Sequence, residues 1–175
     1  CARCGLRRSK IIPPYRGFLK RPSVFSTGGF LIFTKKQKMQ KEEVLKLANG
    51  ICKNTLMETL DIRFTDVGED FLTAQMPVTS KIHQPDGVLH GGASVALAES
   101  VGSAAVFILN KDADQMVRGI EISANHLKSV REGMLEATAR PIHQGKTIQL
   151  WEIKITDDAG ALVCLSKLTT YTRPK

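Results

Sequence analysis

The sequence predicts an α+β protein in which an antiparallel sheet wraps round one central helix. Two observations support this fold class. The apolar run 91–109, GGASVALAESVGSAAVFIL, is long enough for a helix and has no polar face, so other elements must cover it all round. The strand-like segments are joined mostly by short turns, which favours antiparallel pairing and argues against a doubly wound parallel sheet.

A first helix is expected over residues 40–49, because QKEEVLKLANG has a helical pattern and Asn49-Gly50 is a common helix stop. Two strands are expected next, in LDIRFTDVGEDFLTAQMPVT, on either side of a Gly-Glu-Asp turn. Their apolar residues alternate with polar neighbours at period two, which is typical of half-buried strands. The alternating apolar residues are Ile62, Phe64, Leu72, Ala74 and Met76.

A polar loop over residues 78–90 leads into the apolar helix 91–109. Four further strands are expected after it. The last two are separated by DDAG, residues 157–160, which is a strong hairpin turn signal. The expected strand ranges are 116–124, 133–141, 147–156 and 161–172.

Charge is distributed unevenly along the 175 residues. The chain has a formal net charge of +8, but residues 1–38 contain ten Lys or Arg and no Asp or Glu. The remainder has 15 basic and 17 acidic residues, a net charge of −2. A body without a basic excess argues against a nucleic-acid partner. The leader segment FSTGGFLIF is too short to span a membrane.

Three interpretations of the basic leader, residues 1–38, remain open. It is an organelle-targeting peptide, a disordered basic arm, or upstream sequence that is not part of the mature protein. We favour the third, because Met39 directly precedes a good helical segment. A single domain is then expected over residues 39–175.

The four cysteines do not form a metal-binding or disulfide framework. Cys1 and Cys4 make one CxxC pair, with no second pair at zinc-finger spacing. Cys52 and Cys164 lie in apolar settings and are expected to be reduced and buried. This favours a reducing, cytoplasmic compartment.

Glu99 is the only ionisable side chain in the run 91–109. A solvated helix face normally carries several charged residues, so a single acid is expected to be held in apolar surroundings. An ionised carboxylate is costly there unless it is paired or protonated, and such a group is suited to act as general base or nucleophile. The alternative is that this face borders solvent and Glu99 has no special role.

His90-Gly91-Gly92 opens the same helix. Its free N–H groups and small residues can bind an anion or stabilise a developing oxyanion, although a plain tight loop is the alternative. Gly91 and Glu99 are eight residues apart, about 12 Å along a helix axis. That is too far for both to act on one carbonyl. Two antiparallel copies of the helix could bring Glu99 of one beside Gly91 of the other, which predicts a site shared within a homodimer.

The segment HQPDGVLHGGASVALAESVGS resembles the signature of the hotdog-fold acyl-CoA thioesterases, the type that includes phenylacetate-pathway and 4-hydroxybenzoyl-CoA thioesterases. EISANHLKSVREG and PIHQGKTIQLWEI extend the resemblance over residues 56–172. Within the family, the resemblance is greatest to the 1,4-dihydroxy-2-naphthoyl-CoA thioesterases of menaquinone biosynthesis. It implies a hotdog fold and hydrolysis of an aromatic acyl-CoA, without cofactor or metal. A homodimer, and a dimer of dimers, is the expected assembly.

The resemblance also implies roles for individual residues. Glu99 matches the family's catalytic carboxylate, which acts either as nucleophile on the thioester carbonyl or as base for a water. Gly91 would donate its N–H to the thioester oxygen, with Gln84 and His90 helping to hold and polarise that oxygen. Two serines would lie near the acyl group or the attacking water: Ser103 and Ser100.

The CoA arm is implied to be held by one glycine and two loops, with Lys128 and Lys146 as candidates for its phosphates. Relatives often read His-His-Arg-Pro where this chain reads His-Leu-Lys-Ser, and a lysine contacts phosphate less directionally than the arginine fork. The implied substrate-binding residues, besides Ser100, are Gly119, His126, Leu127, Lys128, Ser129, His143, Gln144, Gly145, Lys146, Thr147 and Ile148.

Two other functions stay open at this point. One is a hotdog dehydratase of hydroxyacyl thioesters, and the other is a non-catalytic acyl-CoA-binding module. The spacing from His90 to Glu99 suits hydrolysis better than dehydration. A pure binder of a neutral thioester would gain nothing from an unpaired acid.

Overall fold

The structure is a computed structural model, and it describes residues 40–110 and 115–174. The expectations for the basic leader, residues 1–38, and for its two cysteines lie outside the described residues.

The described part contains the helices and strands that the sequence predicts, together with two short additional elements. A four-residue helix, α2, begins after Thr55, whose side chain accepts a hydrogen bond from the Met57 N–H. A single 3₁₀ turn, η1, lies in the loop before the apolar helix. Both are too short to give a periodic pattern in the sequence. In chain order the elements are α1 (Lys41–Gly50), α2 (Leu56–Thr59), β1 (Arg63–Val67), β2 (Leu72–Val78), η1 (Ser80–Ile82), α3 (Gly91–Leu109), β3 (Gln115–His126), β4 (Gly133–Gln144), β5 (Ile148–Thr156) and β6 (Leu162–Pro174).

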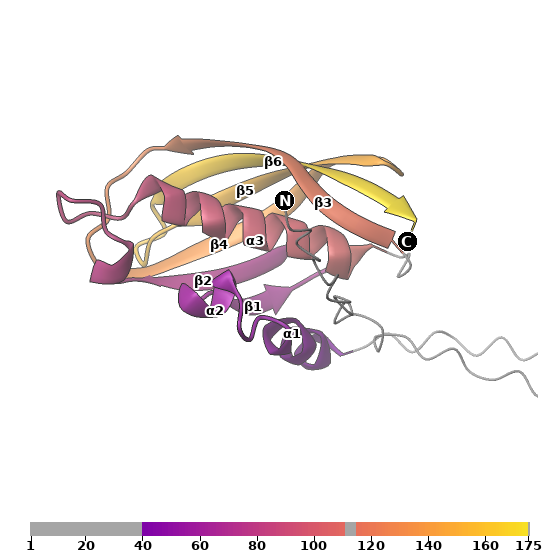
Figure 1. The fold of residues 1–175 in the computed structure, drawn as a ribbon, viewed down its shortest axis with the longest axis horizontal. Helices are drawn as coiled ribbons and strands as arrows, with labels where there is room; N and C mark the ends of the chain where they lie inside the picture. Colours follow the sequence, from indigo (N-terminus) through magenta and orange to yellow (C-terminus); the bar gives the residue numbers. More distant parts are fainter. Residues whose placement is uncertain (1–39, 111–114, 175) are drawn as a thin grey trace, which may run out of the picture. The chain divides into compact units, whose positions relative to one another are not determined.

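The strands form one antiparallel sheet in the order β1-β2-β4-β5-β6-β3. Figure 1 shows this sheet curving round α3, which confirms the expected α+β class and the hotdog arrangement. β3 follows α3 in the chain but pairs with the last strand, β6, so it forms an edge of the sheet. The sequence did not predict this strand order.

The core lies between α3 and the inner face of the sheet. All five alternating residues predicted from the first two strands are buried, and so are Trp151 and the free thiols of Cys52 and Cys164. Gly102 lets α3 approach β6 closely, because a Cβ at this position would lie 2.5 Å from Cδ2 of Leu168.

The expectation that α3 is covered all round is wrong for the single chain. The helix is apolar and long enough to span a membrane, but here it packs against the sheet. The sheet buries one side, which includes Leu97, Val101 and Ala105. The opposite side is only half-buried, and it carries Val95 and Ala96 as well as Glu99, Ser100 and Ser103.

Candidate active site

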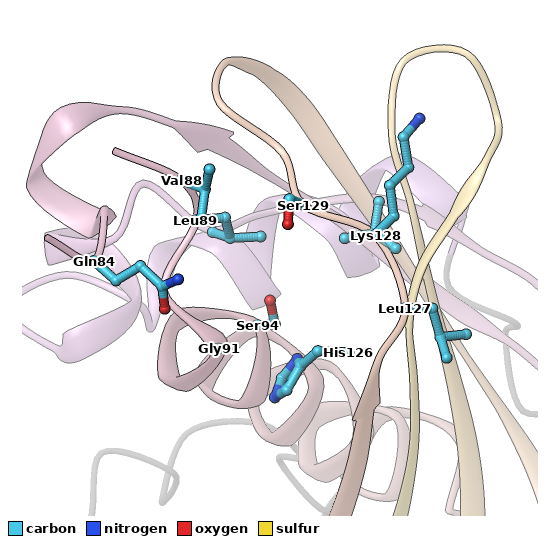
Figure 2. Close-up of a pocket in the computed structure, with 10 residues that line it drawn as sticks. Gln84, Val88, Leu89, Gly91, Ser94, His126, Leu127, Lys128 and Ser129 are labelled. Carbon is cyan, nitrogen blue, oxygen red and sulfur yellow. The ribbon is translucent and has the colours of Figure 1, made fainter. Parts of the chain in front are cut away.

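A pocket of about 230 Å³ opens at the N-terminal end of α3. This is below the roughly 300–1,000 Å³ of pockets that bury a drug-sized ligand, so the pocket can hold a ring or a thioester but not a whole acyl-CoA. Its walls come from the loop before α3, the first turn of α3, the residues after β3 and the start of β6, as Figure 2 shows. The lining residues are Gln84, Val88, Leu89, Gly91, Ser94, His126, Leu127, Lys128, Ser129 and Val163.

His90 holds the start of α3 but does not line the pocket. Its Nδ1 accepts a hydrogen bond from the Gly92 N–H at 2.8 Å, so the ring acts as the N-cap of the helix. Gly91 lies against the ring of His126, since a Cβ on Gly91 would be 2.8 Å from Nε2 of that histidine. The glycine is therefore needed for the close approach of β3 to the helix start.

Gln84 is held by a tight turn in the loop before α3. Its N–H donates to the Val88 carbonyl at 2.8 Å, and its own carbonyl accepts from the Gly87 N–H at 2.9 Å. The guanidinium of Arg131 donates to the carbonyls of Asp86 and Gly87 and ties this turn to the segment after β3. In Figure 2 the side-chain amide of Gln84 lies at the edge of the pocket.

Glu99 lies in the middle of α3, on the half-buried side. Ser103, one turn later, donates a hydrogen bond from Oγ to its Oε1 at 3.0 Å. The carboxylate rests against the backbone of Gly119 on β3, in the space that a Cβ of that residue would occupy. The expected full burial of Glu99 is not found in the single chain. The side chain is nevertheless held between two elements and does not project freely.

The single chain keeps Glu99 away from the pocket, as the eight-residue spacing predicts. Glu99 contacts Gly119, whereas Gly91, at the pocket, lies eight residues before Glu99 and about 12 Å away along α3. Ser100 is also half-buried on α3 and does not line the pocket.

The two loops implied to hold CoA are also separated within one chain. The residues 126–129 line the pocket. The other segment, residues 143–148, covers the end of β4, the β4–β5 turn and the start of β5. It lies at the opposite end of β6, because Ile148 pairs with Tyr171 whereas His126 pairs with Cys164. Seven residues of β6 separate these two pairs, about 23 Å at the usual strand rise. One chain therefore cannot bring both loops to one end of a ligand.

The two candidate phosphate-binding lysines differ in their surroundings. Lys128 forms an ion pair with Asp157 in the β5–β6 turn. The hydrogen bond from Lys128, together with those from the backbone N–H groups of Ala161 and Ala159, lowers the pKa of Asp157. Lys146, in the β4–β5 turn, is exposed and has no ion pair within the described residues. It is the freer of the two cations.

Ser94 is a pocket residue to which the sequence assigned no role. It is only 1% exposed, and it lines the pocket floor one turn after Gly91. The available signal was its spacing, since residues three apart share a helix face. Among residues 40–110 and 115–174, no group of His, Cys, Asp and Glu could hold a metal ion.

Comparison with known proteins identifies the family. The thioesterase superfamily matches residues 86–164, which include Glu99 and all the pocket residues except Gln84. The 1,4-dihydroxy-2-naphthoyl-CoA hydrolase of Escherichia coli is 45% identical over 131 residues, which are 75% of this chain and 96% of that protein. A proofreading thioesterase of Cronobacter turicensis is 44% identical over 131 residues, 75% of this chain and 95% of that protein.

A solved thioesterase of Staphylococcus aureus has the same fold. Two variants of it, one with a glutamine and one with a glutamate replaced by alanine, superpose on this chain with TM-scores of 0.65 and 0.66. They are 36% and 37% identical to it and cover 68% and 69% of this chain, and 98% and 99% of their own. With this fold, these matches and a pocket at a glycine-led helix start, the chain belongs to the thioesterase superfamily and is a thioesterase.

Proposed function

We propose that this thioesterase hydrolyses an aromatic acyl-CoA, such as 1,4-dihydroxy-2-naphthoyl-CoA, to the free acid and CoA. In the direct route Glu99 takes a proton from water, the water oxygen attacks the thioester carbon, the carbon–sulfur bond breaks, and the leaving CoA thiolate takes up that proton. In the covalent route a Glu99 oxygen attacks the carbon and the CoA thiolate leaves; water then hydrolyses the resulting acyl–Glu99 anhydride, which releases the free acid, restores Glu99 and supplies the proton to the thiolate. The E. coli hydrolase and the C. turicensis proofreading thioesterase are almost equally similar to this chain but have different names. The choice of acyl group therefore rests only on similarity to the E. coli hydrolase.

The observation that carries the proposal is the setting of Glu99. It is the only charged side chain of α3, it is oriented by the Ser103 hydroxyl, and it fills the space left by a glycine on β3. A carboxylate held in this way can take a proton from water or attack a carbonyl without first being ordered. Its second oxygen makes no hydrogen bond within the described residues, so it remains available for the reaction.

The oxyanion is proposed to bind at the start of α3. The Gly91 N–H, at the positive end of the helix, and the Gln84 amide are hydrogen-bond donors at the pocket. Gln84 and Glu99 are fifteen residues apart. In the S. aureus thioesterase the substituted glutamine and glutamate are also fifteen residues apart, which supports pairing these two residues in one site.

We place the complete site between two chains. β3 is an edge strand with Ile120 57% exposed, and it lies beside the half-buried side of α3. Two chains that join these surfaces with their helices antiparallel would bury them and bring Glu99 of one chain to the pocket of the other. The same pairing would move the β4–β5 turn of one chain, with Lys146, toward the residues 126–129 of its partner.

The test of the reaction is release of CoA from 1,4-dihydroxy-2-naphthoyl-CoA and benzoyl-CoA by the wild type and by Glu99→Gln. Loss of the base or nucleophile should lower kcat by at least about a hundredfold. Glu136→Gln is the matched control, because Glu136 is exposed on the outer face of the sheet, where it bonds Gln75. Equal rates for wild type and Glu99→Gln would refute the assignment.

Mixing two inactive variants tests whether the site is shared. In a heterodimer of Glu99→Gln and Gln84→Ala chains, one of the two shared sites would contain both native residues. Random exchange makes half of the dimers mixed, so about a quarter of the wild-type activity should return. A site built within one chain predicts no recovery.

We also propose that residues 39–175 form the catalytic domain. Chains that begin at residue 1 and at Met39 should then release CoA at the same rate. A slower reaction of the shorter chain would assign a role to the leader.

A further inference from the structure

The pocket contains one polar group that the reaction proposed above does not use. The hydroxyl of Ser94 is at the floor of the pocket, and the residue is 1% exposed. A serine within a helix usually bonds the carbonyl four residues earlier or points to solvent. Ser94 does neither. The carbonyl of His90 accepts from the backbone N–H groups of Ala93 and Ser94, and the Ser94 hydroxyl makes no hydrogen bond within the described residues.

Figure 2 shows where this hydroxyl points. It is directed into the pocket, toward the hydroxyl of Ser129 on the facing wall. Ser129 is exposed and can keep a water partner when a ligand enters. Ser94 is deeper, among the apolar side chains of Val88, Leu89 and Val163, and at 1% exposed it has almost no contact with water.

The position of Ser94 relative to Gly91 relates it to the acyl group. The two residues share a face of α3 and are separated by a rise of about 4.5 Å. If the thioester oxygen lies on the Gly91 N–H at the helix start, the acyl group that continues into the pocket passes over Ser94. The serine is thus placed beside the acyl group rather than beside the thioester.

We propose that Ser94 is a specificity-determining residue, which favours aryl groups that carry a ring hydroxyl over the same aryl groups without one. The inference rests on the proposed hydrolysis of an aromatic acyl-CoA. A hydroxylated ring supplies Ser94 with a hydrogen-bond partner. A plain ring leaves this buried hydroxyl without a partner, so it binds less tightly by about the value of one hydrogen bond.

The experiment compares kcat/KM for 2-hydroxybenzoyl-, 4-hydroxybenzoyl- and benzoyl-CoA in the wild-type chain of residues 1–175 and in Ser94→Ala. The preference for the better hydroxylated substrate over benzoyl-CoA should fall about five- to tenfold in the variant, the value of one neutral hydrogen bond. Ser166→Ala is the control, because Ser166 is a buried serine on β6 that does not line the pocket. It should leave the preference unchanged.

Two results would overturn the inference. If the preference for the hydroxylated substrate over benzoyl-CoA is unchanged in Ser94→Ala, the Ser94 hydroxyl does not bind the ring hydroxyl. An equal loss of kcat/KM on all three substrates would place Ser94 at the thioester instead.

A binding measurement keeps the test independent of turnover. Non-hydrolysable phenacyl-CoA thioethers provide the two ligands, and the one with a ring hydroxyl should bind the wild type more tightly than the one without. The ratio of the two Kd values should shrink about five- to tenfold in Ser94→Ala, again the value of one neutral hydrogen bond. If no thioester is hydrolysed but this difference is present and lost in the variant, the proposed reaction fails and the role of Ser94 stands. Equal affinities for both thioethers would refute it.

Discussion

Replacing Gly119 with alanine should separate catalysis from stability. Gly119 has no side chain, and the carboxylate of Glu99 occupies the space beside its Cα. An alanine Cβ would overlap Oε1 of Glu99, so that oxygen would have to withdraw by about 1 Å, a displacement that can cost a reaction about a hundredfold. A hundredfold loss in kcat corresponds to about 2.7 kcal/mol in the activation free energy.

The effect on folding should be small for two reasons. The atom that must move is the end of a flexible side chain at a half-exposed position, and alanine is better tolerated than glycine within a strand. The free energy of unfolding should therefore change by less than about 1 kcal/mol. The assay is CoA release at saturating substrate, with Tm measured on the same samples.

Gly102→Ala is the matched control, with the opposite expected pattern. Its Cβ would lie 2.5 Å from Leu168 and 3.3 Å from Ile153, both of which are fully buried. Overpacking of this kind costs about 1–3 kcal/mol, so Tm should fall while folded molecules keep their turnover. Wild-type kcat in Gly119→Ala would refute the reasoning, because the carboxylate would then not need its position in the structure.

Two further predictions concern the charged turns of the sheet. Lys146→Ala should raise KM for acyl-CoA about fivefold, the value of a surface ion pair of about 1 kcal/mol, and should not change KM for an N-acetylcysteamine thioester, which has no phosphate. Lys128→Ala should change KM less, because Asp157 already pairs with Lys128. A larger effect of Lys128→Ala than of Lys146→Ala would contradict this ranking. Asp157→Asn should lower Tm near neutral pH. The folded-state pKa of Asp157 is lowered. The stability that its carboxylate contributes is therefore complete above the unfolded-state pKa of about 4 and is lost as the pH falls through the folded-state pKa. A difference in Tm between wild type and Asp157→Asn that grows in acid would contradict the assignment.

The sequence predicted the features that depend on local pattern. α3 begins and ends where the apolar run does, because that run is flanked by a capping histidine and an asparagine. The alternation from Ile62 to Met76 identified the inward face of the first two strands. Glu99 could be selected because it is the one charge in an apolar helix, which is a property of composition.

Features that depend on contacts between distant segments could not be predicted in this way. No local pattern places β3 beside β6, and only that pairing brings Gly119 to Glu99. The ion pair of Lys128 with Asp157 joins residues 29 positions apart. It could not be predicted from the sequence, from which Lys128 was expected to be free to bind a phosphate. Ser94 was overlooked because serine is common in helices, and its importance depends on the pocket that other segments form above it.

The half-buried side of α3 links the chemistry to the assembly. A surface with Val95 and Ala96 on the helix and Ile120 on the neighbouring edge strand is costly to leave in water, and it adjoins the carboxylate of Glu99. Covering this surface with a second chain would stabilise the pair and remove water from Glu99. The second chain would also supply the oxyanion donors, because the donors in the chain of Glu99 itself lie too far from its carboxylate. Catalysis and dimerisation would then depend on one interface, so substitutions that weaken the interface should lower activity even when Glu99 and Gln84 are intact.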